Sequence, residues 1–277
     1  AWSADGQFVA FWAQDHYQDG TLTKMTLYVA QADGSQVTLV RDFTTRPGPG
    51  PAFYTDGLNW TPSGKELVYS AADNSATFVA IDSVNGDTRY LLDLPTGDGN
   101  FQPALSPDLD ELPGYQGFLA VRGFDGSQSP DGPACSDIFV VPVDDDADGY
   151  LLPVDPTLFV NVTNKPGSSQ FHPSWSPDVD ALACFDDESL AVYQLTTGES
   201  WTVAPNYLTG VSAQDRPTWT SDGYDLVFTS RDIGYGDLAI TAADGFGPVV
   251  NYTATRNVTE IAPAWNPQWD PAGPGGF

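Results

Sequence analysis

A short sequence signal recurs six times along the chain and points to a repeat architecture. Each copy is a tryptophan or leucine followed by Ser, Thr or Asn and then by a turn of Pro, Asp or Gly residues. Successive copies are separated by 58, 45, 70, 44 and 46 residues, and three of these five intervals are close to the length of a four-stranded propeller blade. The copies begin at Trp2, Trp60, Leu105, Trp175, Trp219 and Trp265.

The residues after each signal follow a fixed order. An apolar run comes first, as at 225–228, and a second, half-alternating run follows, as at 237–240. Both runs are short and rich in β-forming residues, and no segment shows helical periodicity. A hairpin dipeptide such as Asp244-Gly245 and a more polar strand complete each unit. We therefore predict an all-β propeller whose blades each hold an inner strand with the signal, two buried middle strands and an outer edge strand.

The number of blades follows from the five complete units, which span residues 1–266 and precede a Pro/Gly-rich tail at 267–277. Two arrangements fit this count. In one, the ring is five-bladed and Ile261–Trp265 supplies the inner strand of the first blade. In the other, the chain is an excerpt of a larger ring, for example a six-bladed one. We favour the five-bladed ring, because closure by the last strand removes exposed sheet edges.

Two of the units also resemble a known repeat. The segments 171–178 (FHPSWSPD) and 216–230 resemble the WD-repeat-like repeat of TolB-like β-propellers, which also recurs in the N-terminal propellers of prolyl-oligopeptidase-type peptidases and tricorn-like proteins. The resemblance extends over residues 1–266. It implies six blades in the TolB type, structural roles for the signal residues, and a non-catalytic, protein-binding module of the cell envelope.

The charge of the chain limits its partners. Ten Lys and Arg residues stand against 37 Asp and Glu residues, so the net charge is −27. This disfavours nucleic acids and anionic membrane surfaces, which need basic patches. No apolar stretch approaches the ~20 residues that span a bilayer. We interpret the acidic surface as a solubility device of an extracellular, cell-surface or periplasmic protein. Four sequons are candidate glycosylation sites, at Asn59, Asn161, Asn251 and Asn257.

The two cysteines, Cys135 and Cys184, have two interpretations. Cys184 lies in a strand position that holds Phe or Tyr in three other blades, so it fits a small core residue. Cys135 precedes a strand of the adjacent blade, and a disulfide between the two cysteines across blades is the alternative.

One segment has the spacing of a calcium loop. Asp144, Asp146, Asp148 and Asp155 occupy loop positions 1, 3, 5 and 12, and Gly149 occupies position 6, where a sharp turn is needed. Flanking helices are missing, so the segment would resemble the calcium loops of β-propellers rather than an EF-hand. We predict calcium bound by these four aspartates. The alternative is an ordinary hairpin, because other blades also turn at this point.

Sequence motifs for catalysis are few. The chain has two histidines, His16 and His172, and it contains no HExxH, GxSxG or P-loop pattern. Paired carboxylates occur by abundance among 37 acidic residues, so a glycosidase or lyase stays open.

Binding residues are expected where the inner strands meet the central channel. Alignment on the signal places amides, one histidine, one arginine and one glutamate at the channel mouth, and this set suits hydrogen bonding to a peptide or glycan. We predict a non-enzymatic structural or protein-binding propeller that uses the channel mouth or inserted loops. Its rivals are a carbohydrate-active enzyme and the propeller domain of a longer peptidase. The channel-mouth residues are Asn100, Gln102, Gln170, His172, Gln214, Arg216 and Glu260.

Overall fold

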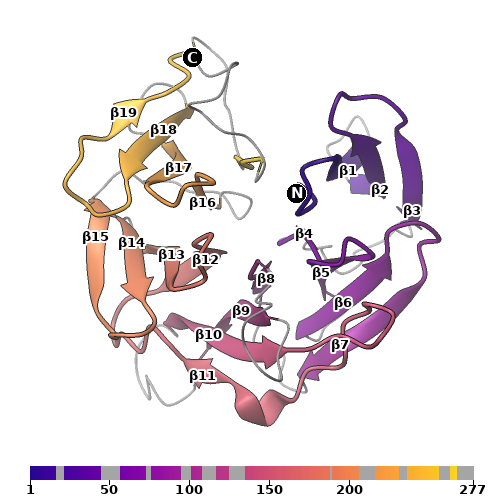
Figure 1. Cartoon of the computed structure of the whole chain (residues 1–277), viewed down its shortest axis with the longest axis horizontal. Coiled ribbons are helices and arrows are strands. Elements are labelled where there is room, and N and C mark those ends of the chain that lie inside the picture. The colour runs from indigo at the N-terminus through magenta and orange to yellow at the C-terminus, as the bar shows by residue number, and fades with distance from the viewer. Residues whose placement is uncertain are drawn as a thin grey trace.

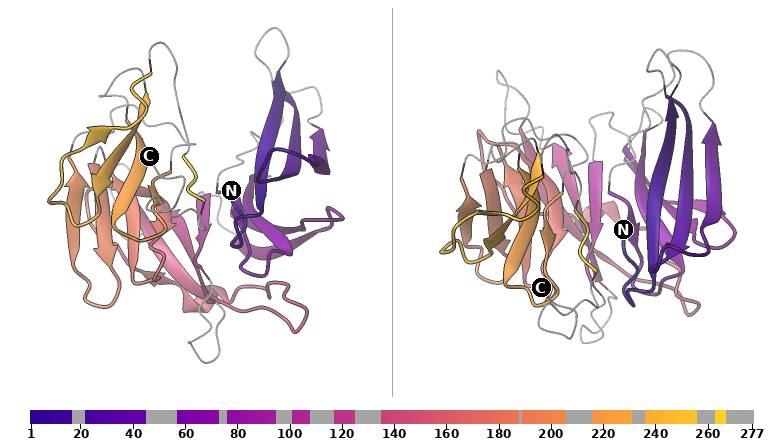
Figure 2. Two further views of the ribbon diagram at one scale, coloured as in Figure 1. Left: turned by 45° about the horizontal axis from the view of Figure 1, so that its top comes forward. Right: turned by 90° about the horizontal axis from the view of Figure 1, so that it is seen from above.

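Five antiparallel sheets are arranged side by side around a central axis in the computed structural model (Figure 1). They form a five-bladed β-propeller, which confirms the predicted fold class. Figure 2 shows the same blades from two further directions, with the chain passing from blade to blade around the axis. The structure describes residues 1–16, 22–44, 57–72, 76–94, 101–107, 117–124, 135–187, 189–205, 216–230, 236–255 and 263–266.

Each blade is a meander whose strands pair in chain order from the axis outward. The strands of blade 1 are β1 (Phe8–His16), β2 (Leu22–Gln31) and β3 (Thr38–Thr44). Those of blade 2 are β4 (Asn59–Trp60), β5 (Glu66–Ala72), β6 (Ala76–Asp82) and β7 (Thr88–Leu94). Those of blade 3 are β8 (Phe101–Leu105), β9 (Gly117–Phe124), β10 (Ser136–Val143) and β11 (Val160–Asn161).

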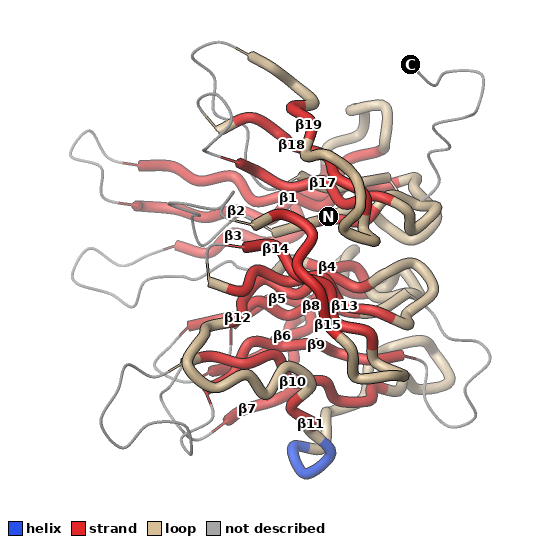
Figure 3. The backbone as a smooth tube through the Cα atoms, turned by 90° about the vertical axis from the view of Figure 1, so that its left-hand side faces the viewer, coloured by secondary structure: helices blue, strands red, loops and turns tan. Residues whose placement is uncertain are grey.

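The last two blades are the most regular. Blade 4 contains β12 (Gln170–Trp175), β13 (Ala181–Asp186), β14 (Ser189–Gln194) and β15 (Ser200–Ala204). Blade 5 contains β16 (Thr218–Trp219), β17 (Asp225–Ser230), β18 (Asp237–Ala242) and β19 (Val250–Asn251). Within the described ranges the one helical turn is η1 (Pro156–Leu158), which Figure 3 shows in blue beside β11. No helix in these ranges has the length and apolarity needed to cross a membrane.

The inner strand of blade 1 comes from the start of the sequence. Trp2 forms a bridge with Val9 of β1, and the Ala10 amide donates to the Ala1 carbonyl at 2.8 Å. This corrects the expectation that Ile261–Trp265 supplies that strand. Residues 263–266 form no strand, while residues 261 and 262 lie outside the described ranges.

Apolar side chains fill the space between blades because alternate residues of a strand face opposite sides of its sheet. Leu226 and Phe228 of β17 belong to one buried cluster with Phe185 and Val192 of blade 4. Cys184 is fully buried in the cluster between blades 3 and 4, as expected for a core residue. The two cysteines are not joined by a disulfide bond, so the cross-blade disulfide is absent from this structure.

The turn of the recurrent signal is held by its own Ser, Thr and Asp side chains. In blade 4 the Ser176 hydroxyl donates to Asp178 Oδ1 at 2.6 Å and accepts from the Ala181 amide at 3.0 Å. Thr220 makes the same pair of bonds with Asp222 and Asp225 in blade 5. The hydroxyl and carboxylate therefore replace backbone partners at a sharp reversal.

The tryptophans of the signal join successive inner strands by one repeated hydrogen bond. In each case the indole Nε1–H of one signal donates to a backbone carbonyl of the preceding unit. The acceptor is the residue directly before the signal of that unit. Leu105 occupies the tryptophan position of the third signal and has no N–H to donate. The four bonds are Trp60 to Ala1 at 3.2 Å, Trp175 to Ala104 at 2.9 Å, Trp219 to Ser174 at 3.0 Å and Trp2 to Ala264 at 3.2 Å.

Replacement of Trp175 by Phe tests this bond. The ring stays apolar, but the buried Ala104 carbonyl loses its donor, so the free energy of unfolding should fall by about 1–3 kcal/mol. Trp175→Ala also removes packing and should cost about 3–5 kcal/mol. Urea denaturation measures both values. Equal stability of Trp175→Phe and the wild type would show that the bond contributes nothing to the ring.

Candidate functional site

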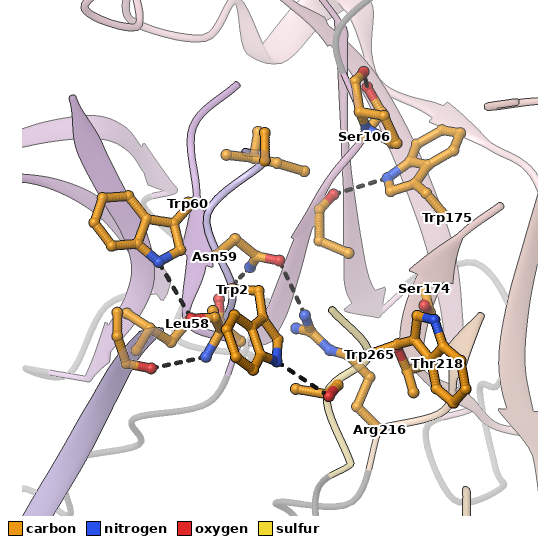
Figure 4. Close-up of a pocket in the computed structure, with 18 of the residues that line it drawn as sticks. Trp2, Leu58, Asn59, Trp60, Ser106, Ser174, Trp175, Arg216, Thr218 and Trp265 are labelled. Carbon is orange, nitrogen blue, oxygen red and sulfur yellow. Dashed lines mark hydrogen bonds between the residues drawn. The ribbon is translucent and has the colours of Figure 1, made fainter. Parts of the chain in front are cut away.

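A cavity of about 750 Å³ lies where the inner strands surround the axis (Figure 4). Its described lining combines indole rings with small hydroxyl and amide side chains, and it contains one charged side chain, Arg216. The labelled residues in the close-up come from the inner segments of blades 1 to 5 and from 263–266. The lining includes Trp2, Leu58, Asn59, Trp60, Ser106, Ser174, Trp175, Arg216, Thr218 and Trp265.

Arg216 reaches across the cavity from blade 5 to blades 2 and 3. Its Nη1 donates to Asn59 Oδ1 at 3.0 Å, and its Nη2 donates to the Pro103 carbonyl at 2.6 Å. Asn59 Nδ2 donates to the same carbonyl at 2.6 Å. The guanidinium is therefore fixed in place at the channel, as the alignment predicted for Arg216. Asn59 was missed as a channel residue, although it directly precedes Trp60 and so belongs to an inner strand.

His172 and Gln102 form a buried pair beside the cavity. Both residues precede a proline and have left-handed backbones, with φ of 56° and 69°. Each lies at a bulge where the inner strand shifts register against its neighbour. Gln102 Oε1 accepts from the His172 amide at 2.7 Å, and Gln102 Nε2 lies 3.1 Å from His172 Nε2. The bulges thus turn two side chains from neighbouring blades toward each other.

This pairing defines the proton on the imidazole. Because Gln102 Oε1 accepts a hydrogen bond, its Nε2 amide is the donor to His172 Nε2, which leaves the ring proton on Nδ1. Burial, with the Arg216 and Arg122 charges adding to it, lowers the pKa of His172 well below 6.5. His172 is therefore a neutral imidazole that holds blades 3 and 4 together at the cavity wall.

Gln170 is not a channel residue. Its side chain is fully buried in blade 4, where Nε2 donates to Asp186 Oδ1 at 2.9 Å and to Ser168 Oγ at 2.7 Å. Gln102 is also absent from the cavity lining. Of the described residues predicted for the channel mouth, only His172 and Arg216 line the cavity. Asn100, Gln214 and Glu260 lie outside the described residues.

Three of the four aspartates of the predicted calcium loop, Asp144, Asp146 and Asp155, use their carboxylates within local turns. Asp146 Oδ1 accepts from the amides of Asp148 and Tyr150, and these bonds lower the pKa of Asp146. Asp155 caps η1 by accepting from Thr157, and Asp144 accepts from the Asp145 amide. Among the described residues, no three His, Cys, Asp or Glu side chains are grouped to hold a metal ion. Calcium binding by this segment stays a prediction from its sequence.

In the structure, residues 144–155 form a clasp between blades 3 and 2. The segment leaves β10 and extends over blade 2, where Figure 1 shows it beside β7. Ser63 Oγ donates to the Gly149 carbonyl at 2.7 Å, and the Val154 amide donates to the Leu91 carbonyl at 2.8 Å. Gly149 has a φ of 81°, which a glycine adopts without strain. The Asp-Gly dipeptide was correctly predicted as a turn, but its contact with blade 2 was not predicted.

Glu66 is the buried centre of this clasp. Its carboxylate is 1% exposed and accepts from the Leu151 amide at 2.8 Å. Arg89 Nε and Nη2 also donate to it, at 2.9 and 2.6 Å, in a bidentate pair. One buried carboxylate of blade 2 therefore binds an outer strand of its own blade and a segment of blade 3.

Three of the four sequons have structural roles. Asn161 Nδ2 donates to the buried Asp137 at 2.9 Å, and Asn251 Nδ2 donates to the equivalent Asp237 at 2.5 Å in blade 5. Asn59 is held inside the channel by Pro103 and Arg216. Glycosylation at Asn59, Asn161 and Asn251 stays a prediction from their sequons. Asn257 lies outside the described residues.

Comparisons with known proteins support the fold. No protein-family model and no curated protein sequence matches this chain. Among solved structures, it is similar to a protein described as putative TolB from Agrobacterium tumefaciens, with 15% identity, a TM-score of 0.53, and coverage of 85% of this chain and 72% of that one.

Two other similar structures have different biological roles. An oligogalacturonate lyase from Vibrio parahaemolyticus has 12% identity and a TM-score of 0.50, with 96% of this chain and 82% of that one covered. A chain of a nidogen/laminin complex has 11% identity and a TM-score of 0.51, with 87% and 76% covered. At these identities the likeness establishes the propeller fold, which serves binding proteins and enzymes alike.

The state of His172 predicts a pH dependence of stability. Its pKa is lower in the folded protein than in the unfolded chain, so the unfolded state binds more protons as the pH falls through about 6.5. The free energy of unfolding should therefore decrease between pH 7.5 and 5.5. His172→Gln should flatten this part of the profile. Thermal denaturation of both proteins over that range is the measurement, and parallel profiles would contradict the buried neutral imidazole.

Glu66→Gln tests the clasp. The amide keeps the shape but removes the charge that Arg89 and the Leu151 amide share, so the free energy of unfolding should fall by about 1.5–3 kcal/mol. Glu199→Gln, at an exposed hairpin position, is the matched control and should change stability by less than about 0.5 kcal/mol. Urea denaturation measures both. A Glu66→Gln protein as stable as the control would show that the clasp is dispensable.

Proposed function

We propose that the protein is a non-enzymatic binding module whose central channel receives a segment of a partner protein. The observation that carries this proposal is the cavity of about 750 Å³ at the axis, with indole rings, amides and hydroxyls around one fixed arginine. This volume is within the range of about 300–1,000 Å³ that is usual for ligand sites.

The lining suits a peptide because it offers both apolar and hydrogen-bonding surface. The rings of Trp2, Trp60 and Trp265 provide flat apolar area at low cost in side-chain entropy. The hydroxyls of Ser174 and Thr218 can each donate to and accept from peptide groups, whereas that of Ser106 is already bonded to the Pro107 carbonyl and the Phe118 amide. Large aromatic side chains and arginine are enriched at protein-binding surfaces.

Arg216 adds orientation to this site. Asn59 and the Pro103 carbonyl hold its guanidinium, so a bound segment does not have to order the side chain. The guanidinium presents its donors in a planar fork, and it therefore favours acceptor groups of a ligand such as a backbone carbonyl or a carboxylate.

The state of His172 supports binding over proton transfer. A general base must reach a substrate proton through a ring nitrogen with a suitable pKa. His172 Nε2 is engaged by Gln102, the residue is 3% exposed, and its pKa is lowered well below 6.5. Within the described lining, this histidine is better suited to support the wall than to act on a ligand.

The same proposal places the protein in the cell envelope or outside the cell. The support for this location is the resemblance of segments 171–178 and 216–230 to TolB-like repeats, together with the net charge of −27. Such an acidic chain disfavours nucleic acids and anionic lipid surfaces as partners.

A peptide screen with a matched arginine pair tests the channel. Peptides of four to eight residues and oligosaccharides are titrated against the protein by tryptophan fluorescence, and each mixture is analysed by chromatography for turnover. We expect a peptide to bind without being cleaved. Arg216→Lys keeps the charge but loses the forked donors, and it should weaken binding about tenfold, or about 1.4 kcal/mol.

The control for this screen is Arg41→Lys. Arg41 lies on β3, the outer strand of blade 1, and donates to the Gly86 carbonyl in the turn between β6 and β7, away from the channel. This substitution should leave binding unchanged. Release of product from an oligosaccharide or peptide would overturn the non-enzymatic assignment and favour the lyase, glycosidase or peptidase alternative. Binding of an oligosaccharide alone, without turnover, would replace the protein partner by a glycan.

A further inference from the structure

The tryptophan hydrogen bonds place residues 263–266 in the inner circle next to blade 1. In blades 2, 4 and 5 the indole donates to the residue just before the preceding signal. Trp2 of blade 1 does the same with Ala264, which directly precedes the sixth signal at Trp265. Each of these indoles thus donates to the inner segment of the preceding unit. Residues 263–266 therefore occupy the position of the inner strand of a blade that would precede blade 1.

The face of blade 1 that is turned toward this position is partly open. Phe11 of β1 is 38% exposed. In each sheet one residue of the second strand pairs with the first residue of the signal, and Phe11 lies two residues after it. In the other four sheets the residue at this position is buried against the preceding blade. The exposed fractions of these residues are 5% for Tyr69, 1% for Val121, 0% for Cys184 and 0% for Phe228.

The open face is aromatic and continuous with the channel. Phe11 stacks on Tyr28, its cross-strand partner in β2, with ring centroids 5.7 Å apart. Tyr28 is half-buried, as is Phe139 at the same position of blade 3, whereas Val79, Ala191 and Ala239 at this position are buried. Phe11 also lines the central cavity together with Trp265. In Figure 1 the spacing between blades 5 and 1 is wider than that between the other neighbours.

We propose that the face of Phe11 and Tyr28 is a docking surface for a β-hairpin of another polypeptide. The hairpin packs face-on against β1 and β2, as each blade in the ring packs on the blade before it. Such a hairpin presents apolar side chains at alternate positions toward Phe11 and Tyr28 and polar ones away from them. This surface adjoins the channel site, with which it shares Phe11, and its occupant goes beyond the proposed function.

Charge determines the rest of the partner's chemistry. The chain carries a net charge of −27, so an acidic hairpin would be repelled and a basic one attracted at a distance. The polar positions of the hairpin are therefore Lys or Arg. A second copy of this chain carries the same negative charge and would have to overcome that repulsion.

A synthetic turn-locked hairpin with Val or Tyr at one set of alternate positions and Lys or Thr at the other is the probe. It is titrated by calorimetry at low salt against the full chain. We expect binding that weakens at least tenfold in Phe11→Ser and in Tyr28→Thr. Phe246→Ser, at a 93% exposed aromatic in the hairpin of blade 5, is the matched control and should bind as the wild type does.

Three results overturn the proposal. The first is equal binding by Phe11→Ser, Tyr28→Thr and the wild type, once circular dichroism shows that the variants are folded. The second is no binding of the lysine hairpin, or equal binding of a version with Glu in place of Lys. The third is a concentration-dependent dimer in sedimentation that Phe11→Ser dissociates, which would make a second copy the occupant. Arg216→Lys should leave hairpin binding intact, which separates this test from that of the channel.

Discussion

The indole-to-carbonyl hydrogen bond between successive inner strands is the contact on which the geometry of the ring depends. Most other contacts between blades are apolar, and apolar burial is strong but has no preferred direction. The bond is directional, and it connects the same two backbone positions at Trp2, Trp60, Trp175 and Trp219. It therefore constrains the distance and rotation between blades 1 and 2, 3 and 4, and 4 and 5, whereas contacts of residues 144–155 join blades 2 and 3.

The strands and turns were predictable because their signals are local. Alternating side chains and Asp-Gly turns act within a few residues, so the blades and the core role of Cys184 follow from the sequence. The clasp of Glu66 and the channel pair of Asn59 and Arg216 join residues 85 and 157 positions apart, and no local pattern specifies such contacts. The bond of the Asn161 amide to Asp137 was not predictable for the same reason, because its sequon carries no signal for a partner 24 residues away.

The position of the channel residues ties function to stability in this fold. Asn59, Ser174 and Thr218 each directly precede a tryptophan of the signal, so the residues that line the cavity alternate with those that close the ring. At Ser174, a change that widens the cavity also acts on the carbonyl that receives the Trp219 indole. Variation in ligand specificity is therefore easier at side chains such as Arg216. This residue lines the channel but does not belong to the pair of residues that form the repeated indole-to-carbonyl bond.

The clasp also bears on how the repeat can evolve. Tandem repeats are usually gained, lost or exchanged as single units, because each unit contacts only its neighbours through a generic interface. The segment 144–155 replaces part of the generic interface by contacts specific to Ser63, Glu66 and Leu91. Duplication or transfer of blade 3 alone would leave the Glu66 carboxylate without the Leu151 amide. Blades 2 and 3 thus constitute one heritable module, whereas the regular blades 4 and 5 keep the interchangeability of ordinary repeats.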